Sequence, residues 1–262
     1  MKLSLYQVDA FTSEVFGGNP AAVVPLETWL PDEVMQSIAI ENNLSETAFF
    51  IPATGGYDLR WFTPATEVDL CGHATLASAF VLFNLLQHEG KQICFHTRNE
   101  GDLGVSLADD GSMALDFPSK PPVEAAQPQG LVEALGAKPV ELHLNEDYLA
   151  VFPSEAAVKA ISPDFKIMSE IDARGIIVTA PGDEVDFVSR FFAPKYGIDE
   201  DPVTGSAHCV LTPYWAKRLG KQSLDARQVS SRVGHLQCGL HDDRVSIAGR
   251  AVLYMQGEIN ID

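Results

Sequence analysis

The chain has 262 residues, of which 46% are hydrophobic and 21% charged, so it can bury a sizeable core and does not have the composition of a disordered chain. Its 36 acidic residues outnumber 18 basic ones, and the net charge of −18 disfavours binding to nucleic acid or to an anionic membrane surface. A small anionic substrate is not excluded, because a few local donors can overcome the global field inside a pocket.

The start of the chain and its cysteines favour a cytoplasmic protein. The first eleven residues lack the apolar core of a signal peptide, and no stretch reaches the ~18 consecutive apolar residues of a membrane span. The four cysteines include no C-x-x-C pair and are too few for a disulfide scaffold. We therefore expect free thiols in a reducing compartment.

Hydrophobic periodicity in the first 117 residues predicts a mixture of strands and helices. Pro31 suits a first helical turn, so a helix is expected from there to about residue 43, and the apolar stretch 72–88 predicts a second helix. Strands are expected at 3–11, 47–51, 57–63, 93–97, 103–107 and 113–117.

The proline-rich stretch 118–128 is the best linker candidate, which divides the chain into domains 1–117 and 118–262. The terminal strand of the second domain could pack on the first. Beyond the linker, the pattern predicts helices at 129–135 and 205–219, strands at 148–152, 175–180 and 186–192, and terminal strands with a turn at Asp242 and Asp243.

The two halves contain a repeated pattern. Residues 60–64 (RWFTP) precede 69–74 (DLCGHA), and residues 190–194 (RFFAP) precede 201–207 (DPVTGSA). Each copy reads as a strand, a loop with an aspartate, and Gly-x-Ala opening an apolar helix. The repetition predicts two related units, and chance similarity of two strand–loop–helix segments is the alternative.

Gly72 and Gly205 would each stand at a helix start, where unpaired backbone N–H groups and the helix dipole attract anions. If the halves face each other, both starts would point into one cleft and hold a carboxylate or enolate. The alternative is that each glycine merely begins a helix.

Several segments resemble the phenazine-biosynthesis PhzF-like family. They are 8–11 (VDAF), 16–24 (FGGNPAAVV), 42–49 (NNLSETAF), 69–75 (DLCGHAT) and 201–208 (DPVTGSAH). The resemblance implies an α+β, diaminopimelate epimerase-like fold of two pseudo-two-fold related domains, each a curled, mostly antiparallel sheet around a central helix. It also implies a homodimer and a cofactor-independent, metal-free isomerase acting on a small anionic substrate, similar to trans-2,3-dihydro-3-hydroxyanthranilate isomerase.

By the same resemblance, Glu46 matches the catalytic glutamate, and His73 and Asp201 match further active-site residues. Positions that bind substrate or shape the pocket correspond to Ser45, Gly72, Gly205 and Ser206.

The chemistry of Glu46 can also be argued from its surroundings. One carboxyl group can move a double bond by removing a proton from one carbon and delivering it to another, if water is excluded. Its neighbours, Leu44 and residues 48–51, are apolar, so burial would leave it partly protonated near neutral pH. A glutamate at the end of a helix or facing solvent is the alternative.

His73 would lie one residue inside a helix start, where the dipole is expected to lower its pKa and favour a neutral hydrogen-bond donor. Local packing or capping is the alternative. Asp201 could orient a proton or an amine of the substrate, although an isolated loop aspartate is more often a turn or cap residue.

Cys71 precedes Gly72, the position of one catalytic cysteine in epimerases of this fold, but the corresponding residue before Gly205 is Thr204. Threonine is too weak an acid to serve as a thiolate-like base, which argues against a symmetric two-cysteine reaction. Cys71 could also be only a small buried residue, as expected for Cys209 and Cys238.

No zinc-type histidine spacing, dinucleotide fingerprint or Walker A loop is present, so no metal or nucleotide cofactor is expected. Three functions remain open: a carboxylate-based isomerase, an epimerase or dehydratase with Cys71 as base and Thr204 passive or assisting, and a binding protein without catalysis.

Overall fold

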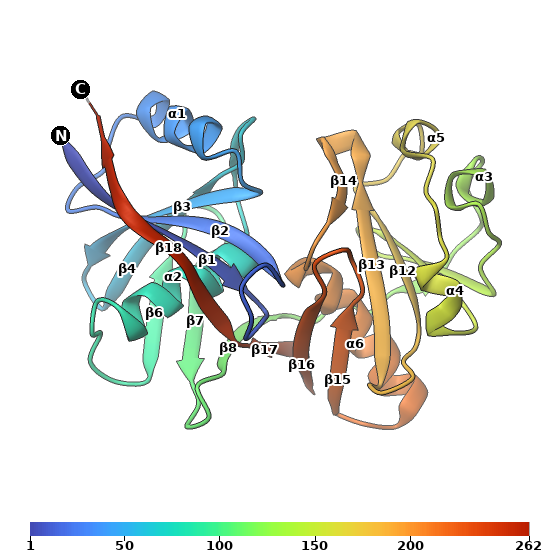
Figure 1. Cartoon of the computed structure of the whole chain (residues 1–262). Helices are drawn as coiled ribbons and strands as arrows, with labels where there is room; N and C mark the ends of the chain where they lie inside the picture. The colour runs from blue at the N-terminus through green and yellow to red at the C-terminus, as the bar shows by residue number, and fades with distance from the viewer. Residues whose placement is uncertain (262) are drawn as a thin grey trace. The chain divides into compact units, whose positions relative to one another are not determined.

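The computed structural model describes residues 1–261 and divides into two compact units (Figure 1). Unit 1 comprises Met1–Asp116 and the terminal segment from Ala248, and unit 2 comprises Phe117–Ile247. The sequence-based division into 1–117 and 118–262, with a terminal strand that could pack on the first domain, differs from these units in the terminal segment, which lies in unit 1. The reason is strand β18 (Ala251–Asn260), which pairs antiparallel along β1 (Lys2–Ala10) from Lys2 opposite Asn260 to Ala10 opposite Ala251.

Unit 1 is built on one sheet in which the order of neighbouring strands is β18, β1, β2, β3, β4, β6, β7, β8. Only the β2–β3 and β4–β6 pairs of this series are parallel. The elements are β2 (Asn19–Pro25), α1 (Asp32–Asn42), β3 (Glu46–Ala53), β4 (Gly56–Phe62), β5 (Glu67–Val68), α2 (Gly72–Asn84), β6 (Gln92–His96), β7 (Asp102–Leu107) and β8 (Met113–Pro118).

The central helix of unit 1 is α2, which contacts β1, β2 and β3 and is buried along most of its length. It ends at Asn84, four residues before the end expected from its apolar run. Gln87 adopts a φ of 55°, and the His88 N–H donates to the carbonyl of Leu82, so the chain reverses there. A left-handed residue with backbone bonds to the last turn is a common way to end a helix.

Unit 2 repeats this plan, with the strand order β9, β10, β11, β12, β13, β15, β16 and parallel pairs at β11–β12 and β13–β15. Its elements are β9 (Val123–Glu124), α3 (Leu131–Leu135), β10 (Glu141–Leu144), β11 (Tyr148–Val151), α4 (Glu155–Lys159), α5 (Phe165–Ser169), β12 (Ile176–Pro181), β13 (Phe187–Ala193), η1 (Pro194–Tyr196), β14 (Ile198–Asp201), α6 (Gly205–Leu219), β15 (Ser223–Gln228), β16 (Gly234–His241) and β17 (Arg244–Gly249).

The stretch 118–128 is not wholly a linker, because β9 lies within it and pairs with β10. Its short length and four prolines in the sequence around it obscured the strand. The turn at Asp242 and Asp243 is present between β16 and β17. Among the helices of residues 1–261, none is long and apolar enough to cross a membrane.

The repeated sequence pattern forms the same structure twice. On β4, the guanidinium of Arg60 binds both carboxylate oxygens of Glu67 on β5, at 2.7 and 2.8 Å. On β13, Arg190 binds both oxygens of Glu200 on β14, at 2.7 and 2.9 Å. Each arginine also lies over a phenylalanine of its own strand. Each of these arginine–glutamate pairs fixes the loop that leads into the central helix of its unit, which is α2 in unit 1 and α6 in unit 2.

Candidate active site

Glu46 and His73 meet in the interior of unit 1. Glu46 is the first residue of β3, and it is brought there because Asn43 ends α1 in a left-handed conformation, with φ 48°. His73 is the second residue of α2. Glu46 Oε2 and His73 Nε2 lie 3.1 Å apart, with the two residues only 9% and 5% exposed.

The contact between these atoms is an ion pair rather than an aligned hydrogen bond, since neither atom has a hydrogen-bond partner of acceptable geometry within residues 1–261. Buried polar atoms without such a partner are uncommon and cost stability, and they are frequent where a ligand or a reaction uses them. This pair of buried atoms, which face each other without an aligned hydrogen bond, is therefore the candidate active site of unit 1.

The imidazole of His73 is positioned from its other side by Asn19 and Cys71. Asn19 Nδ2 lies 3.2 Å from His73 Nδ1, and Cys71 Sγ lies 3.5 Å from the same nitrogen. Asn19 is fully buried, and its Oδ1 accepts a hydrogen bond from Ser45 Oγ at 3.3 Å. Gly18, the residue before Asn19, has a φ of 59° and packs closely against β1. A Cβ on this residue would lie 2.0 Å from the Ala10 carbonyl oxygen, so only glycine fits there.

Burial by itself lowers the pKa of His73, but the neighbouring Glu46 carboxylate, with the Cys71 sulfur as a hydrogen-bond partner, outweighs burial and holds that pKa well above its usual value. The expected lowering of the pKa by the helix start was therefore wrong, because a carboxylate 3.1 Å away acts more strongly than the helix dipole. Burial, followed by the charge of Glu46, raises the pKa of Cys71 to about 11, so this residue is a neutral thiol near pH 7.

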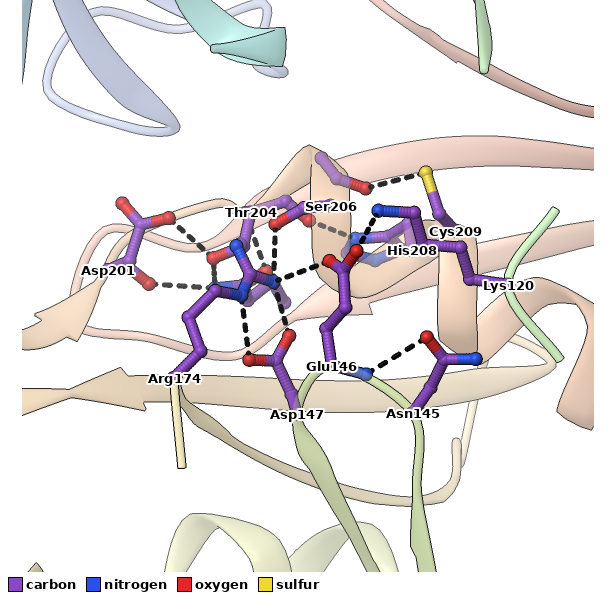
Figure 2. Close-up of polar contacts among 12 residues, drawn as sticks. Lys120, Asn145, Glu146, Asp147, Arg174, Asp201, Thr204, Ser206, His208 and Cys209 are labelled. Carbon is purple, nitrogen blue, oxygen red and sulfur yellow. Dashed lines mark hydrogen bonds and ion pairs between the residues drawn. The ribbon is translucent and has the colours of Figure 1, made fainter. Parts of the chain in front are cut away.

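At the start of α6 in unit 2, the polar groups bond to one another (Figure 2). Thr204 Oγ1 donates to Asp201 Oδ2. The buried side chain of Gln228 accepts from the Thr204 N–H at 2.9 Å and donates to the Asp201 carbonyl oxygen at 2.7 Å and to Thr204 Oγ1 at 3.1 Å. These bonds fix the orientation of the loop carrying Asp201.

Ser206, the second residue of α6, accepts a hydrogen bond from Arg174 Nη2 at 3.1 Å (Figure 2). The guanidinium is held by Asp147, which is fully buried and accepts from Nε at 3.0 Å and also from Nη2. The arginine side chain keeps 39% of its surface exposed. A partly exposed guanidinium, paired with Asp147 and 4.0 Å from Glu146 Oε2, therefore stands beside a helix start, whose backbone N–H groups favour an anionic ligand.

The predicted site residues thus fall into two groups, one per unit. Unit 1 carries Ser45, Glu46, Cys71, Gly72 and His73, and unit 2 carries Asp201, Thr204, Gly205 and Ser206. Sequence reasoning missed Asn19, Arg174 and Gln228. Asn19 lies in a Gly-Gly-Asn-Pro stretch that reads as a simple turn, while Arg174 and Gln228 belong to no recognisable motif.

Glu46, Cys71 and His73 could each offer one ligand atom to a metal ion, since these atoms lie within 4.8 Å of one another. The chemistry of the donors fits such an ion poorly. The Cys71 thiol is buried inside the unit, and the Nδ1 face of the imidazole is already covered by Asn19. The arrangement is better suited to moving a proton than to holding a cation.

Comparisons with known proteins place this site in context. A family model described as phenazine biosynthesis-like protein matches residues 8–257. A Pseudomonas aeruginosa protein described as an uncharacterized isomerase is 51% identical, with 100% of both chains covered. A crystal structure of a PhzF-family phenazine biosynthesis protein from Enterococcus faecalis is 50% identical, with 100% of both chains covered and a TM-score of 0.97.

More distant structures share the fold alone. A probable proline racemase from Agrobacterium radiobacter is 11% identical, with a TM-score of 0.67 and coverage of 99% of this chain and 93% of that one. Together these likenesses confirm the predicted α+β, epimerase-like fold, and the closely similar relatives confirm an enzyme of the isomerase class.

Proposed function

The chain belongs to the phenazine biosynthesis-like (PhzC-PhzF) family, and from that premise we propose that it is a cofactor-independent isomerase of a small carboxylic acid, with Glu46 as the proton-transferring group. The observation that carries the proposal is the buried pair of Glu46 Oε2 and His73 Nε2, 3.1 Å apart and without aligned hydrogen bonds. Both atoms retain the capacity to interact with a reacting molecule.

In the proposed reaction, the Glu46 carboxylate removes a proton from one carbon of the substrate, and the electron pair released forms a new double bond. The existing double bond shifts, and the carboxyl group returns the proton to the carbon at the other end of the shifted system. No redox partner is required. Burial excludes water, so the proton is retained between the two steps.

His73 has two roles in this proposal. Its raised pKa favours the protonated imidazole, which would stabilise the Glu46 carboxylate before proton transfer. A protonated imidazole can also donate to negative charge that develops on the substrate, as preorganised donors do in other sites. Asn19 acts as a positioning residue, because it contacts the ring and Ser45 together.

For unit 2, we assign binding of the substrate's acid group to Ser206, the backbone of Gly205 and the neighbouring cation of Arg174. Asp201 would hold an amino or hydroxyl substituent, which is consistent with a substrate similar to trans-2,3-dihydro-3-hydroxyanthranilate. Thr204 serves to orient Asp201. The identity of the physiological acid and a homodimeric assembly are further predictions from the family resemblance.

An epimerase or dehydratase that uses Cys71 as its base is a weaker candidate. A thiol with a pKa of about 11 supplies little thiolate at neutral pH, and the hydroxyl of Thr204 already donates to Asp201. A protein that binds a ligand without converting it would not require the facing pair of Glu46 and His73.

The proposal is tested by proton NMR in D₂O with a panel of small unsaturated amino and hydroxy acids, including dihydro-hydroxyanthranilate. We expect the wild type to introduce deuterium at a substrate carbon and Glu46→Gln to slow this by about 100-fold or more. Glu155→Gln is the matched control, because Glu155 is also a buried carboxylate beside a cation. It lies in unit 2 and belongs neither to the group around Glu46 nor to the group around Asp201 and Ser206. It should exchange at the wild-type rate.

Cys71→Ser separates the two enzymatic readings. We expect it to keep most of the exchange activity. Loss of exchange in Cys71→Ser with retention in Glu46→Gln would transfer the catalytic role to the thiol. Ligand binding by the wild type without any exchange would favour the non-catalytic reading.

A further inference from the structure

A second cluster of chemically reactive side chains lies in unit 1, on strands β6 and β7 away from the Glu46 group. Cys94 and His96 are separated by one residue on β6, so they lie on the same face of the sheet. Asp102 on β7 is directly opposite His96. Cys94 Sγ lies 3.9 Å from His96 Nδ1, and this nitrogen lies 2.7 Å from Asp102 Oδ1.

We propose that Cys94, His96 and Asp102 form a binding site for one zinc-like divalent cation, with water completing its coordination. One sulfur, one nitrogen and one oxygen ligand atom lie within 4.8 Å of one another. This mixed set of thiolate, imidazole and carboxylate is one that Zn²⁺ binds in a tetrahedral arrangement with an open position. Binding releases the thiol proton and any proton on the imidazole Nδ1.

The surroundings of the cluster leave room for an ion. The residue opposite Cys94 on β7 is Gly104, and a Cβ at that position would meet nothing within 4 Å. Its φ is not in the left-handed region, so the backbone does not require glycine there. Access to the thiol is therefore kept open on the face that carries all three ligand atoms.

The local charge also favours a cation. Asp58 on β4 pairs in register with His96 on its other side, so a row of Asp58, His96 and Asp102 runs across three strands. His96 Nδ1 already faces the Asp102 carboxylate, with Oδ1 at 2.7 Å. The other ring nitrogen, Nε2, is buried, which leaves Nδ1 as the ligand atom.

An isolated exposed pair of histidine and aspartate would contribute little to stability. A bound cation would instead join the two strands at the base of the loop between them, residues 97–101. This loop carries Arg98, which pairs with Glu67 at 3.1 Å, and Asn99, which donates to Asp69 at 2.5 Å. Glu67 and Asp69 lead directly into Cys71 and α2, so occupancy of the site would brace the loop that begins the catalytic helix.

The direct test is titration of the full chain, freed of metal by a chelator, with Co²⁺ as an optical substitute for Zn²⁺. We expect one equivalent to produce a thiolate-to-cobalt charge-transfer band and the visible bands of tetrahedral cobalt, and excess Zn²⁺ to remove them. Cys94→Ser should abolish the charge-transfer band, and His96→Ala or Asp102→Asn should weaken cobalt binding by about 10-fold or more.

Two controls locate the ion. Cys71→Ser removes the thiol of the other candidate ligand group, and His143→Ala removes a histidine that pairs with Glu141 at 3.3 Å without a neighbouring thiol. Both should bind cobalt as the wild type does. The proposal is overturned if no charge-transfer band appears, if the band survives in Cys94→Ser, or if it disappears in Cys71→Ser.

Folding of each variant is checked by circular dichroism in chelator, and the exposed substitution Asp102→Asn carries the test if Cys94→Ser does not fold. The effect on the catalytic loop rests on the proposed function and needs a separate measurement. The rate of deuterium exchange into substrate should change when Zn²⁺ is added to the wild type and should stay the same when Zn²⁺ is added to Asp102→Asn. Absence of all exchange would count against the proposed function while leaving the optical test of the site unaffected.

Discussion

The N-termini of helices α2 and α6 have similar backbone conformations but carry side chains of different chemistry. Their N-cap residues, Cys71 and Thr204, are both extended, with ψ of 106° and 104° and φ of −144° and −116°. At the second helical position, His73 faces a carboxylate in unit 1, whereas Ser206 accepts a hydrogen bond from a guanidinium in unit 2. Under the proposed function, the same strand–loop–helix arrangement carries the proton-transfer group in unit 1 and the anion-binding group in unit 2.

Two buried histidines, His73 and His208, show that the direction of an imidazole pKa shift depends on which groups contact the ring. His208 lies in the first turn of α6, and its Nδ1 is 2.7 Å from the Thr204 carbonyl oxygen. The equivalent residue of α2 is Thr75, whose hydroxyl donates to the Cys71 carbonyl oxygen. Burial lowers the pKa of His208 to about 4. The pKa of His73 is raised, although both rings are deeply buried, because only His73 faces a carboxylate.

The largest expected effect follows from substituting the second residue of α2 and, separately, the second residue of α6. We expect His73→Gln to slow proton exchange into substrate by about 100-fold, since it removes a charged donor beside Glu46. Ser206→Ala should mainly weaken substrate binding, visible as a raised KM with little change in kcat. Steady-state kinetics measure both. A larger kcat loss in Ser206→Ala than in His73→Gln would show that the chemistry is not concentrated in unit 1.

The two histidines should give stability opposite dependences on pH. The pKa of His208 is lower in the folded chain than in the unfolded one, so the unfolded state binds more protons between pH 6.5 and pH 4. The free energy of unfolding should therefore fall as pH decreases through this window, by up to about 1.4 kcal/mol per unit and about 3 kcal/mol in all. Urea unfolding of wild type and His208→Gln measures this contribution, which the variant should lack.

His73 provides the opposite case. Its folded pKa is raised, so its stabilising contribution is complete below the unfolded pKa of about 6.5 and is lost as pH rises through the folded pKa. The stability difference between wild type and His73→Gln should shrink as the solution is made alkaline. A difference that instead grows with pH would mean that the ring is neutral in the folded chain.

How much of this could be predicted from sequence depended on the range of the interactions. The helix starts at Gly72 and Gly205 and the recurrence of arginine before each loop follow from local pattern, and the structure shows both. The end of α2 was expected too late because the apolar run continues past the left-handed residue Gln87, and side-chain type alone does not encode that reversal.

Interactions between distant segments could not be derived in the same way. His73 meets Glu46 across 27 residues of sequence and Asn19 across 54, so the sign of its pKa shift required knowledge of which side chain faces the ring. Arg174 reaches Ser206 from a loop 32 residues away without any motif. The family resemblance supplied candidate catalytic positions, but it did not supply the charge states of their side chains.

The smallest expected effect concerns the N-cap position that the two units fill differently. Thr204→Val keeps the shape of the side chain but removes the hydroxyl that donates to Asp201 and accepts from the fully buried Gln228. We expect a loss of about 1–2 kcal/mol in the free energy of unfolding, measured by urea, because a buried amide loses a partner. Thr204→Ser retains the hydroxyl and should cost less. In unit 1, Cys71→Ser alters a residue whose side chain has no counterpart of the Thr204 bonds to Asp201 and Gln228, so a cost equal to that of Thr204→Val would show that the two N-caps are more alike than their contacts indicate.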